Sequence, residues 1–134
     1  MKIATIIVRI LVGLMFVVFG LNGFLQFIPM KEMPTGLAAD FFKAMSESHY
    51  MQAISAFQIL GGLLLLIGFV PLGLLVLGPI LVNILLFHIF LQPKGIEMGI
   101  VVSLLALFLL WSYRWAFVGM VRTSPRAGNT ATPA

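Results

Sequence analysis

The side chains that could do chemistry in this sequence are few, and they are amides, a hydroxyl, an imidazole and a carboxylate set within or beside apolar runs. They are Asn22, Gln26, Gln58, Asn83, His88, Glu97 and Ser103. Amides and hydroxyls donate and accept hydrogen bonds, and an imidazole can also carry a proton. His88 is therefore an interfacial hydrogen-bonding residue, a ligand-binding or proton-handling residue assisted by Glu97 or His49, or a haem or metal ligand.

The sequence offers little support for catalysis. It has no cysteine, which excludes disulfides, thiol relays and thiolate metal sites. Its only two histidines, His49 and His88, have no second strong ligand at close spacing, so we expect no metal site. No nucleophile elbow, phosphate-binding glycine loop or metalloprotease motif is present. We therefore expect no catalytic residues and no catalytic activity of the chain on its own.

Composition indicates a membrane protein. Of the 134 residues, 61% are hydrophobic and 9% are charged, whereas roughly a quarter of residues are charged in soluble domains. Four apolar segments, 10–28, 53–69, 72–90 and 96–115, approach the roughly 20 residues that a helix needs to cross a bilayer. They lack the strict alternation of barrel strands, and the first is too long for a signal peptide core. The predicted fold is an all-α integral membrane four-helix bundle.

The positive charges divide unequally between the two sides that four crossings create. Lys2, Arg9, Arg114, Arg122 and Arg126 fall on the side of the chain ends, and Lys31, Lys43 and Lys94 fall on the other. Cytoplasmic flanks carry the excess of lysine and arginine, so both termini are predicted to be cytoplasmic. This distribution accounts for the net charge of +4 without a nucleic acid partner.

The first connection is long enough to hold a helix of its own. After the helix breakers Pro34 and Gly36, the apolar residues Leu37, Phe41 and Met45 recur at helical spacing with charged residues between them. This pattern predicts a short amphipathic helix in the first, outer loop, lying at the membrane interface.

The remaining connections define the domain organisation. Residues 68–73 and 91–97 are predicted to be tight hairpins because proline and glycine supply their turns. Residues 1–118 are predicted to form a single transmembrane domain, followed by a cytoplasmic tail at 119–134. From Thr123 this tail lacks apolar periodicity, and we expect it to be disordered.

The polar residues form two layers when their depth is counted from the predicted outer helix ends. At about 1.5 Å per residue, the deeper layer lies roughly 9–11 Å in and contains Asn22, Gln58, Asn83 and Ser103. Gln26 and His88 lie about 3 Å in by the same rise, near Glu97. An amide alone in hydrocarbon is costly, so the deeper amides should face one another. They either bond the helices together or line a small polar pocket open to the outer face, unless the helix ends are misassigned.

Helical phase refines this prediction. Gln58 shares a face with Gly61 and Gly62, whose missing side chains would leave room beside the amide, and Asn22 shares one with Gln26. Asn83 and His88 are five residues apart, or roughly 140° around an ideal helix, so they point inward together only if the helix bends, as Pro79 invites.

Two further glycines suggest close helix packing. Gly13 and Gly20 are seven residues apart and lie on one stripe of the first segment. Because small residues permit close approach, this stripe should face either a neighbouring helix or another copy of the protein. The second alternative predicts a homodimer.

Several stretches together resemble a known family. "RILVGLMFVVFGLNGFLQFIPM" from Arg9, "ILGGLLLLIGFVPLGLLVLGPILVNILLFHIFL" and the closing "YRWAF" resemble the DoxX-like family of small four-helix membrane proteins, over residues 9–117. The most specific pieces are Asn22-Gly23, Gly61-Gly62 and the segment 83–88. The resemblance implies a four-helix bundle in a bacterial inner membrane. The family takes its name from a subunit of a thiosulfate:quinone oxidoreductase, and the absence of cysteine argues against a thiol-based role here.

Three classes of function follow from the residues and the resemblance. The first is a noncatalytic subunit or accessory factor of a quinone-linked membrane redox system, with redox partner proteins and a quinone whose carbonyls Asn22, Gln58 or His88 could bond. The second is a binding or transport module for a small lipid-soluble molecule, although no inverted repeat is evident. The third is a structural or assembly protein of the membrane, in which the polar layer is only packing.

Overall fold

The computed structural model describes residues 2–28 and 33–122, and within these residues the chain is helical and contains no strand. Its elements are α1 (Lys2–Leu25), α2 (Gly36–Glu47), α3 (Tyr50–Ile67), α4 (Val70–Phe90), α5 (Ile96–Ser112) and the 3-10 helix η1 (Arg114–Val121). The predicted all-α class and the helix in the first connection are confirmed. Lys31, Arg126 and the tail from Thr123 lie outside the described residues.

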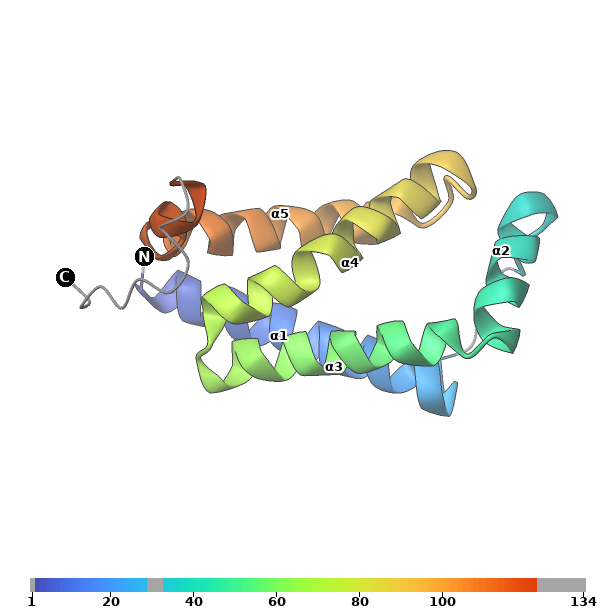
Figure 1. The fold of residues 1–134 in the computed structure, drawn as a ribbon, viewed down its shortest axis with the longest axis horizontal. Helices are drawn as coiled ribbons and strands as arrows, with labels where there is room; N and C mark the ends of the chain where they lie inside the picture. The colour runs from blue at the N-terminus through green and yellow to red at the C-terminus, as the bar shows by residue number, and fades with distance from the viewer. Residues whose placement is uncertain (1, 29–32, 123–134) are drawn as a thin grey trace, which may run out of the picture.

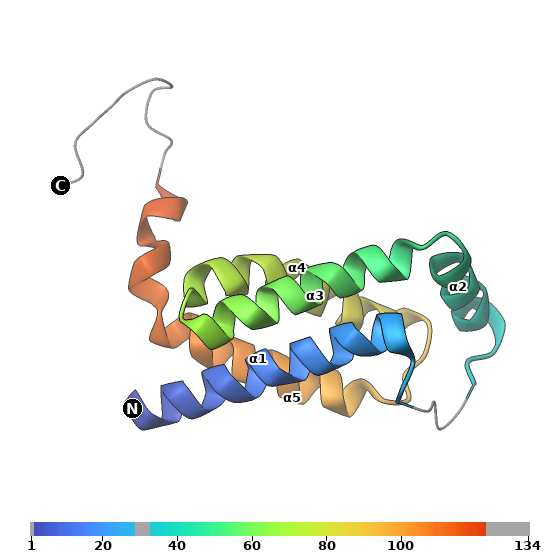
Figure 2. The same ribbon diagram turned by 90° about the horizontal axis from the view of Figure 1, so that it is seen from below.

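The four long helices run side by side in an up-and-down arrangement (Figure 1). In order around the bundle, α1 packs on α3, α3 on α4, α4 on α5 and α5 on α1, while α2 packs across the end of α3. The start of α1 and η1 share the end of the bundle opposite α2, as the turned view also shows (Figure 2).

Three helices, α1, α3 and α4, are long and apolar enough to cross a membrane. The helix α5 has 17 residues, and it passes the same test only together with η1, from which it is bent by 78°. Apolar side chains point outward around the long helices, as in Leu14, Leu63 and Leu104, which are 45 to 61% exposed. A helix that is apolar all round needs an apolar surrounding, so this surface suits lipid. The fold is that of a multi-pass membrane protein.

The helix ends differ from those predicted. The first helix begins at Lys2, not at residue 10, and it ends at Leu25, where Gln26 takes the left-handed conformation with φ of 50°. The backbone N–H of Gln26 donates a hydrogen bond of 2.8 Å to the backbone carbonyl oxygen of Asn22, which closes the helix end. The hairpin predicted at 68–73 is also shorter, because Gly68 caps α3 with φ of 103° and Pro71 lies in the first turn of α4, where a missing N–H costs nothing.

The glycines of α1 and α3 bring these two helices together. A Cβ atom on Gly62 would lie 2.7 Å from the carbonyl oxygen of Gly13, and one on Gly20 would lie 2.8 Å from the carbonyl oxygen of Ser55. The space beside Gly61 is likewise occupied by a neighbouring side chain, because a Cβ atom there would lie 2.5 Å from Leu77 Cγ. The prediction that Gly61 and Gly62 leave room beside an amide is therefore wrong. The Gly13–Gly20 stripe faces α3 of the same chain, which removes the reason for expecting a homodimer.

Candidate binding site

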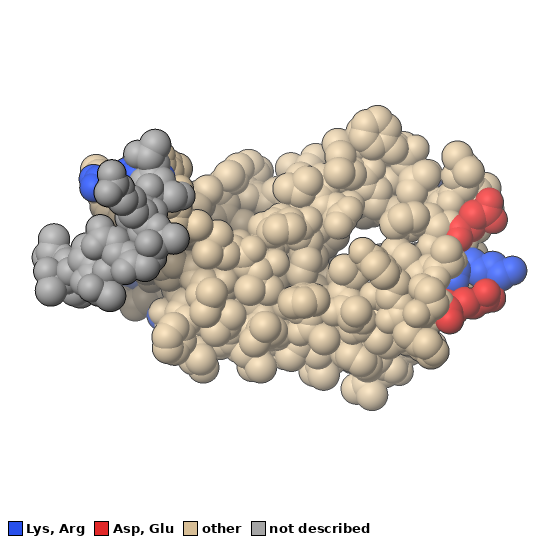
Figure 3. All heavy atoms as spheres, viewed as in Figure 1, with Lys and Arg blue, Asp and Glu red and all other residues tan. Residues whose placement is uncertain are grey.

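A cavity of about 650 Å³ lies between α1, α3 and α4, at the end of the bundle that α2 covers. Seen from one side, the surface of the molecule is hollowed between α3 and α4 beside α2 (Figure 3). The cavity is lined by Phe19, Asn22, Gly23, Phe41, Phe42, Ala44, Met45, Ser48, Tyr50, Met51, Ile54, Ser55, Gln58, Ile80, Asn83, Ile84, Phe87 and His88. This volume is within the range of small-molecule sites, which is roughly 300–1,000 Å³.

Four of the seven candidate residues line this cavity. They come from three helices: Asn22 from α1, Gln58 from α3, and Asn83 and His88 from α4. The two α4 residues reach the same space although they are five positions apart. They do so because the cavity spans a broad face of α4, which also presents Ile80, Ile84 and Phe87.

Three candidate residues lie elsewhere. Gln26 follows the end of α1 and is exposed, and Glu97 is exposed in the first turn of α5. Ser103 lines a different cavity, on another side of α4. His49 caps the start of α3, and its exposed side chain does not line the cavity beside His88. Depth along a helix predicts how far each residue lies from the helix end. It carries no information on the direction in which the side chain points.

The amide of Asn22 has a definite local partner. Its Oδ1 accepts a hydrogen bond of 2.8 Å from the backbone N–H of Ile28, beyond the end of α1. The side-chain oxygen of Asn22 therefore binds the backbone of the segment that follows α1. The NH2 group, on the opposite side of the planar amide, keeps its two donor hydrogens.

The other two amides have no such partner. Among the described residues, no hydrogen bond joins the side chains of Asn22, Gln58 and Asn83, and none of their polar atoms is both buried and unpaired. Direct bonding across the helices, the packing alternative, is absent from this part of the chain. Gln58 and Asn83 instead present free donors and acceptors to the cavity.

His88 is oriented by the connection between α4 and α5. Its Nδ1 lies 2.9 Å from the carbonyl oxygen of Gln92, and its ring meets that of Phe87 edge-on, with centroids 5.3 Å apart. Phe87 in turn lies 5.7 Å from Phe41 of α2, centroid to centroid. These contacts join the imidazole, the end of α4 and the helix α2 around one side of the cavity.

The sequence did not predict the aromatic and apolar part of the lining. Phe41, Phe42 and Met45 of α2 all reach the cavity. The spacing of Phe41 and Met45 predicts the apolar face of an interfacial helix, but that face packs over the cavity, with Phe41 against Phe87. No spacing within α2 indicates that this face meets the rest of the bundle, so the sequence carried no signal for it.

Among the described residues that line the cavity, none is a lysine, an arginine or a carboxylate. The described acidic residues of α2, Asp40 and Glu47, are exposed, as is Lys43, and none of the three lines the cavity. Within residues 2–28 and 33–122, no group of three histidines and carboxylates lies close enough to hold a metal ion. Because a buried ion needs a counter-charge, this lining fits a neutral occupant.

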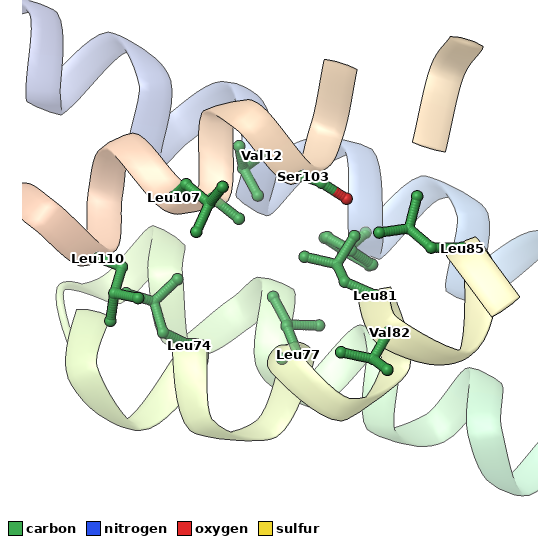
Figure 4. Close-up of a pocket in the computed structure, with 12 residues that line it drawn as sticks. Val12, Leu74, Leu77, Leu81, Val82, Leu85, Ser103, Leu107 and Leu110 are labelled. Atoms are coloured by element: carbon green, nitrogen blue, oxygen red, sulfur yellow. The ribbon is translucent and has the colours of Figure 1, made fainter. Parts of the chain in front are cut away.

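A second, smaller cavity of about 270 Å³ lies between α1, α4 and α5. Its lining is apolar apart from Ser103, whose hydroxyl points into the space between leucine side chains (Figure 4). Ser103 Oγ is buried and has no hydrogen-bond partner. This cavity offers one polar atom against many apolar ones, so it is a poorer candidate for specific recognition than the larger cavity.

Comparison with protein-family models, with curated proteins and with solved structures gave no match to this chain. What the fold and composition define is the class, a multi-pass helical membrane protein. The resemblance to the DoxX-like family stays a prediction that rests on the residues quoted for it.

Proposed function

We propose that this protein is a membrane binding module for a small, neutral, lipid-soluble molecule, held in the cavity beneath α2. The observation that carries the proposal is the combination of a volume of about 650 Å³ with a described lining that holds three amides and an imidazole but no carboxylate, lysine or arginine. Aromatic and apolar side chains would cover the body of the molecule, and the free amide groups of Gln58 and Asn83 would orient its polar atoms. A structural role alone gives no reason to leave these amides without partners.

In this proposal the chain is a DoxX-like four-helix bundle of the bacterial inner membrane, with α5 and η1 together forming the fourth crossing. Both termini are cytoplasmic and α2 lies on the outer side. The distribution of lysine and arginine supports this orientation, because Lys2, Arg9, Arg114 and Arg122 lie toward one end of the molecule, whereas only Lys43 and Lys94 of the described residues lie toward the other. Reporter fusions after Arg122 should be active in the cytoplasm and fusions near Ser46 outside it. The reverse pattern would overturn the orientation.

The quinone-linked accessory role is the case in which the bound molecule is a quinone. A quinone is neutral, lipid-soluble and flat, and its carbonyl oxygens would accept hydrogen bonds from the NH2 groups of Asn22, Gln58 and Asn83. Partner proteins that copurify with the chain would support this case, whereas a bound molecule without partners would support a separate binding or transport module.

The proposal is tested by purifying the full chain in mild detergent and identifying extracted small molecules by mass spectrometry. The variant Asn83→Phe fills the cavity and removes an amide. Leu86→Phe is the matched control, because Leu86 is on the same helix, 44% exposed and outside the lining. The wild-type protein and Leu86→Phe should retain a molecule that Asn83→Phe loses. Equal retention by all three would show that the cavity is not the binding site.

A further inference from the structure

The hydrogen bond at His88 fixes which nitrogen of the ring carries the proton. Nδ1 lies 2.9 Å from the carbonyl oxygen of Gln92, within hydrogen-bond distance. A carbonyl oxygen can only accept, so the hydrogen of this bond must be on Nδ1. In the neutral ring, Nε2 is then unprotonated and is a hydrogen-bond acceptor.

The two sides of the ring face different surroundings. The Nδ1–Cε1 edge is turned toward the connection to α5, where a Cβ atom on Gly95 would lie 3.4 Å from Cε1. The residue also lines the cavity. Among the described residues, no side chain or backbone group donates to Nε2, and Nε2 is not one of the buried atoms that lack a partner. Nε2 therefore keeps an accessible, unbonded lone pair on a residue that lines the cavity.

No hydroxyl of the described lining donates to this acceptor. Ser48, a lining residue, donates its hydroxyl hydrogen to the carbonyl oxygen of Met45 over 3.4 Å, and its oxygen accepts from the N–H of Tyr50 over 3.3 Å. The cavity therefore combines an aromatic and apolar lining, amides and hydroxyls that both donate and accept, and the imidazole Nε2, an acceptor that cannot donate.

We infer that the molecule bound in this cavity carries a hydroxyl group that donates a hydrogen bond to Nε2 of His88. The inference rests on the proposed binding function and narrows its ligand to lipid-soluble phenols and alcohols. An amine would be protonated at neutral pH, and no described residue of the lining offers a carboxylate to pair with it. A ketone, an ether or an oxidised quinone has no hydrogen to give, so in the quinone-linked case the form bound here would be the reduced quinol. Among hydroxyl compounds a phenol fits best, because Phe19, Phe41 and Phe87 line the space around a ring.

The test compares two probes that differ only in this hydrogen, 4-nonylphenol and its methyl ether, 4-nonylanisole. Binding to the full chain in lipid nanodiscs is measured by mass spectrometric quantification after gel filtration, with partition into protein-free nanodiscs subtracted. The wild-type protein should bind the phenol about tenfold more tightly than the ether, a ratio that corresponds to about 1.4 kcal/mol. His88→Phe should lose this preference while its affinity for the ether stays the same.

Each outcome assigns the failure to one of the two proposals. If the wild-type protein binds both probes equally and Asn83→Phe binds neither, the cavity is a binding site but the hydroxyl inference is wrong. If the wild-type protein retains neither probe above the level of Asn83→Phe, both the site and the inference are wrong. The comparison within the wild-type protein needs no variant, so it decides the question even where His88→Phe does not fold.

Discussion

The same substitution, glycine to alanine, should have opposite effects on stability at two buried glycines. Gly62 is tightly packed between α3 and α1, whereas Gly99 of α5 has room for a methyl group. In Gly62→Ala the new methyl group would lie 2.7 Å from the carbonyl oxygen of Gly13, 2.9 Å from Val17 Cγ2 and 3.0 Å from the backbone nitrogen of Val17. Two of these three atoms belong to the backbone of α1, so the methyl fits only if the two helices separate. Overpacking of this kind costs about 1–3 kcal/mol.

Gly99→Ala in α5 is the matched control. Gly99 is also buried and helical, but a Cβ atom there would meet Ile84 Cγ2 and Leu85 Cδ2 at 3.5 Å each, which is ordinary van der Waals contact. Both substitutions gain the same intrinsic helix preference of alanine over glycine, about 1 kcal/mol. We therefore expect Gly62→Ala to lower the free energy of unfolding by about 1 kcal/mol and at most about 2 kcal/mol, and Gly99→Ala to raise it by up to about 1 kcal/mol.

The assay is reversible unfolding in a fixed detergent by titration with sodium dodecyl sulfate, followed by circular dichroism, with thermal unfolding as a second measure. The difference between the two variants should be about 2 kcal/mol, because the helix term is common to both. A shift of both variants in the same direction by the same amount would refute the reasoning, since helix propensity alone would then govern both positions.

Three further predictions concern polar and charged side chains. Asn22→Ala should lower the free energy of unfolding by about 0.5–1.5 kcal/mol in the same titration, since it removes the bond to the Ile28 amide. Asn83→Ala should change it little, and equal losses would contradict the assigned bond. Ser103→Ala should raise it by about 1 kcal/mol, because it removes a buried hydroxyl without a partner; a loss would mean that the hydroxyl is bonded in the membrane. Arg114→Ala should speed proteolysis within η1 by a few fold, because the guanidinium lies 4.3 Å from the ring centroid of Trp111 and bonds its carbonyl oxygen; an unchanged rate would exclude this contact as the anchor of η1.

The sequence was sufficient to predict the number and type of the long helices, because an apolar run of about 20 residues has the length and composition of a membrane-crossing helix. It did not predict the start of α1, since an arginine at position 9 is typical of a helix flank. In the structure Arg9 belongs to the helix, and its guanidinium lies near Gly68 in the turn between α3 and α4. A long charged side chain can reach the end of a neighbouring hairpin, so a charge does not mark a helix end.

The candidate site was predictable only in part. The amides of Asn22, Gln58 and Asn83 were expected together because isolated amides in hydrocarbon are costly, and the structure brings them to one cavity. Ser103 was expected with them at equal depth, but it points to the other cavity. The contribution of α2 depends on how the chain folds back over the bundle, a non-local contact that no spacing within the segment encodes.

The unequal lengths of α1 and α5 have a consequence for the surrounding bilayer. At about 1.5 Å per residue, the 24 residues of α1 extend for about 36 Å, whereas the 17 residues of α5 extend for about 26 Å before the chain turns by 78°. Lipids beside α5 must therefore shorten by several ångströms relative to those beside α1, or the bundle must tilt toward its short side. Either adjustment costs a fraction of a kcal/mol per ångström of mismatch. In a bilayer, such a bundle would deform the surrounding lipid unequally around its circumference.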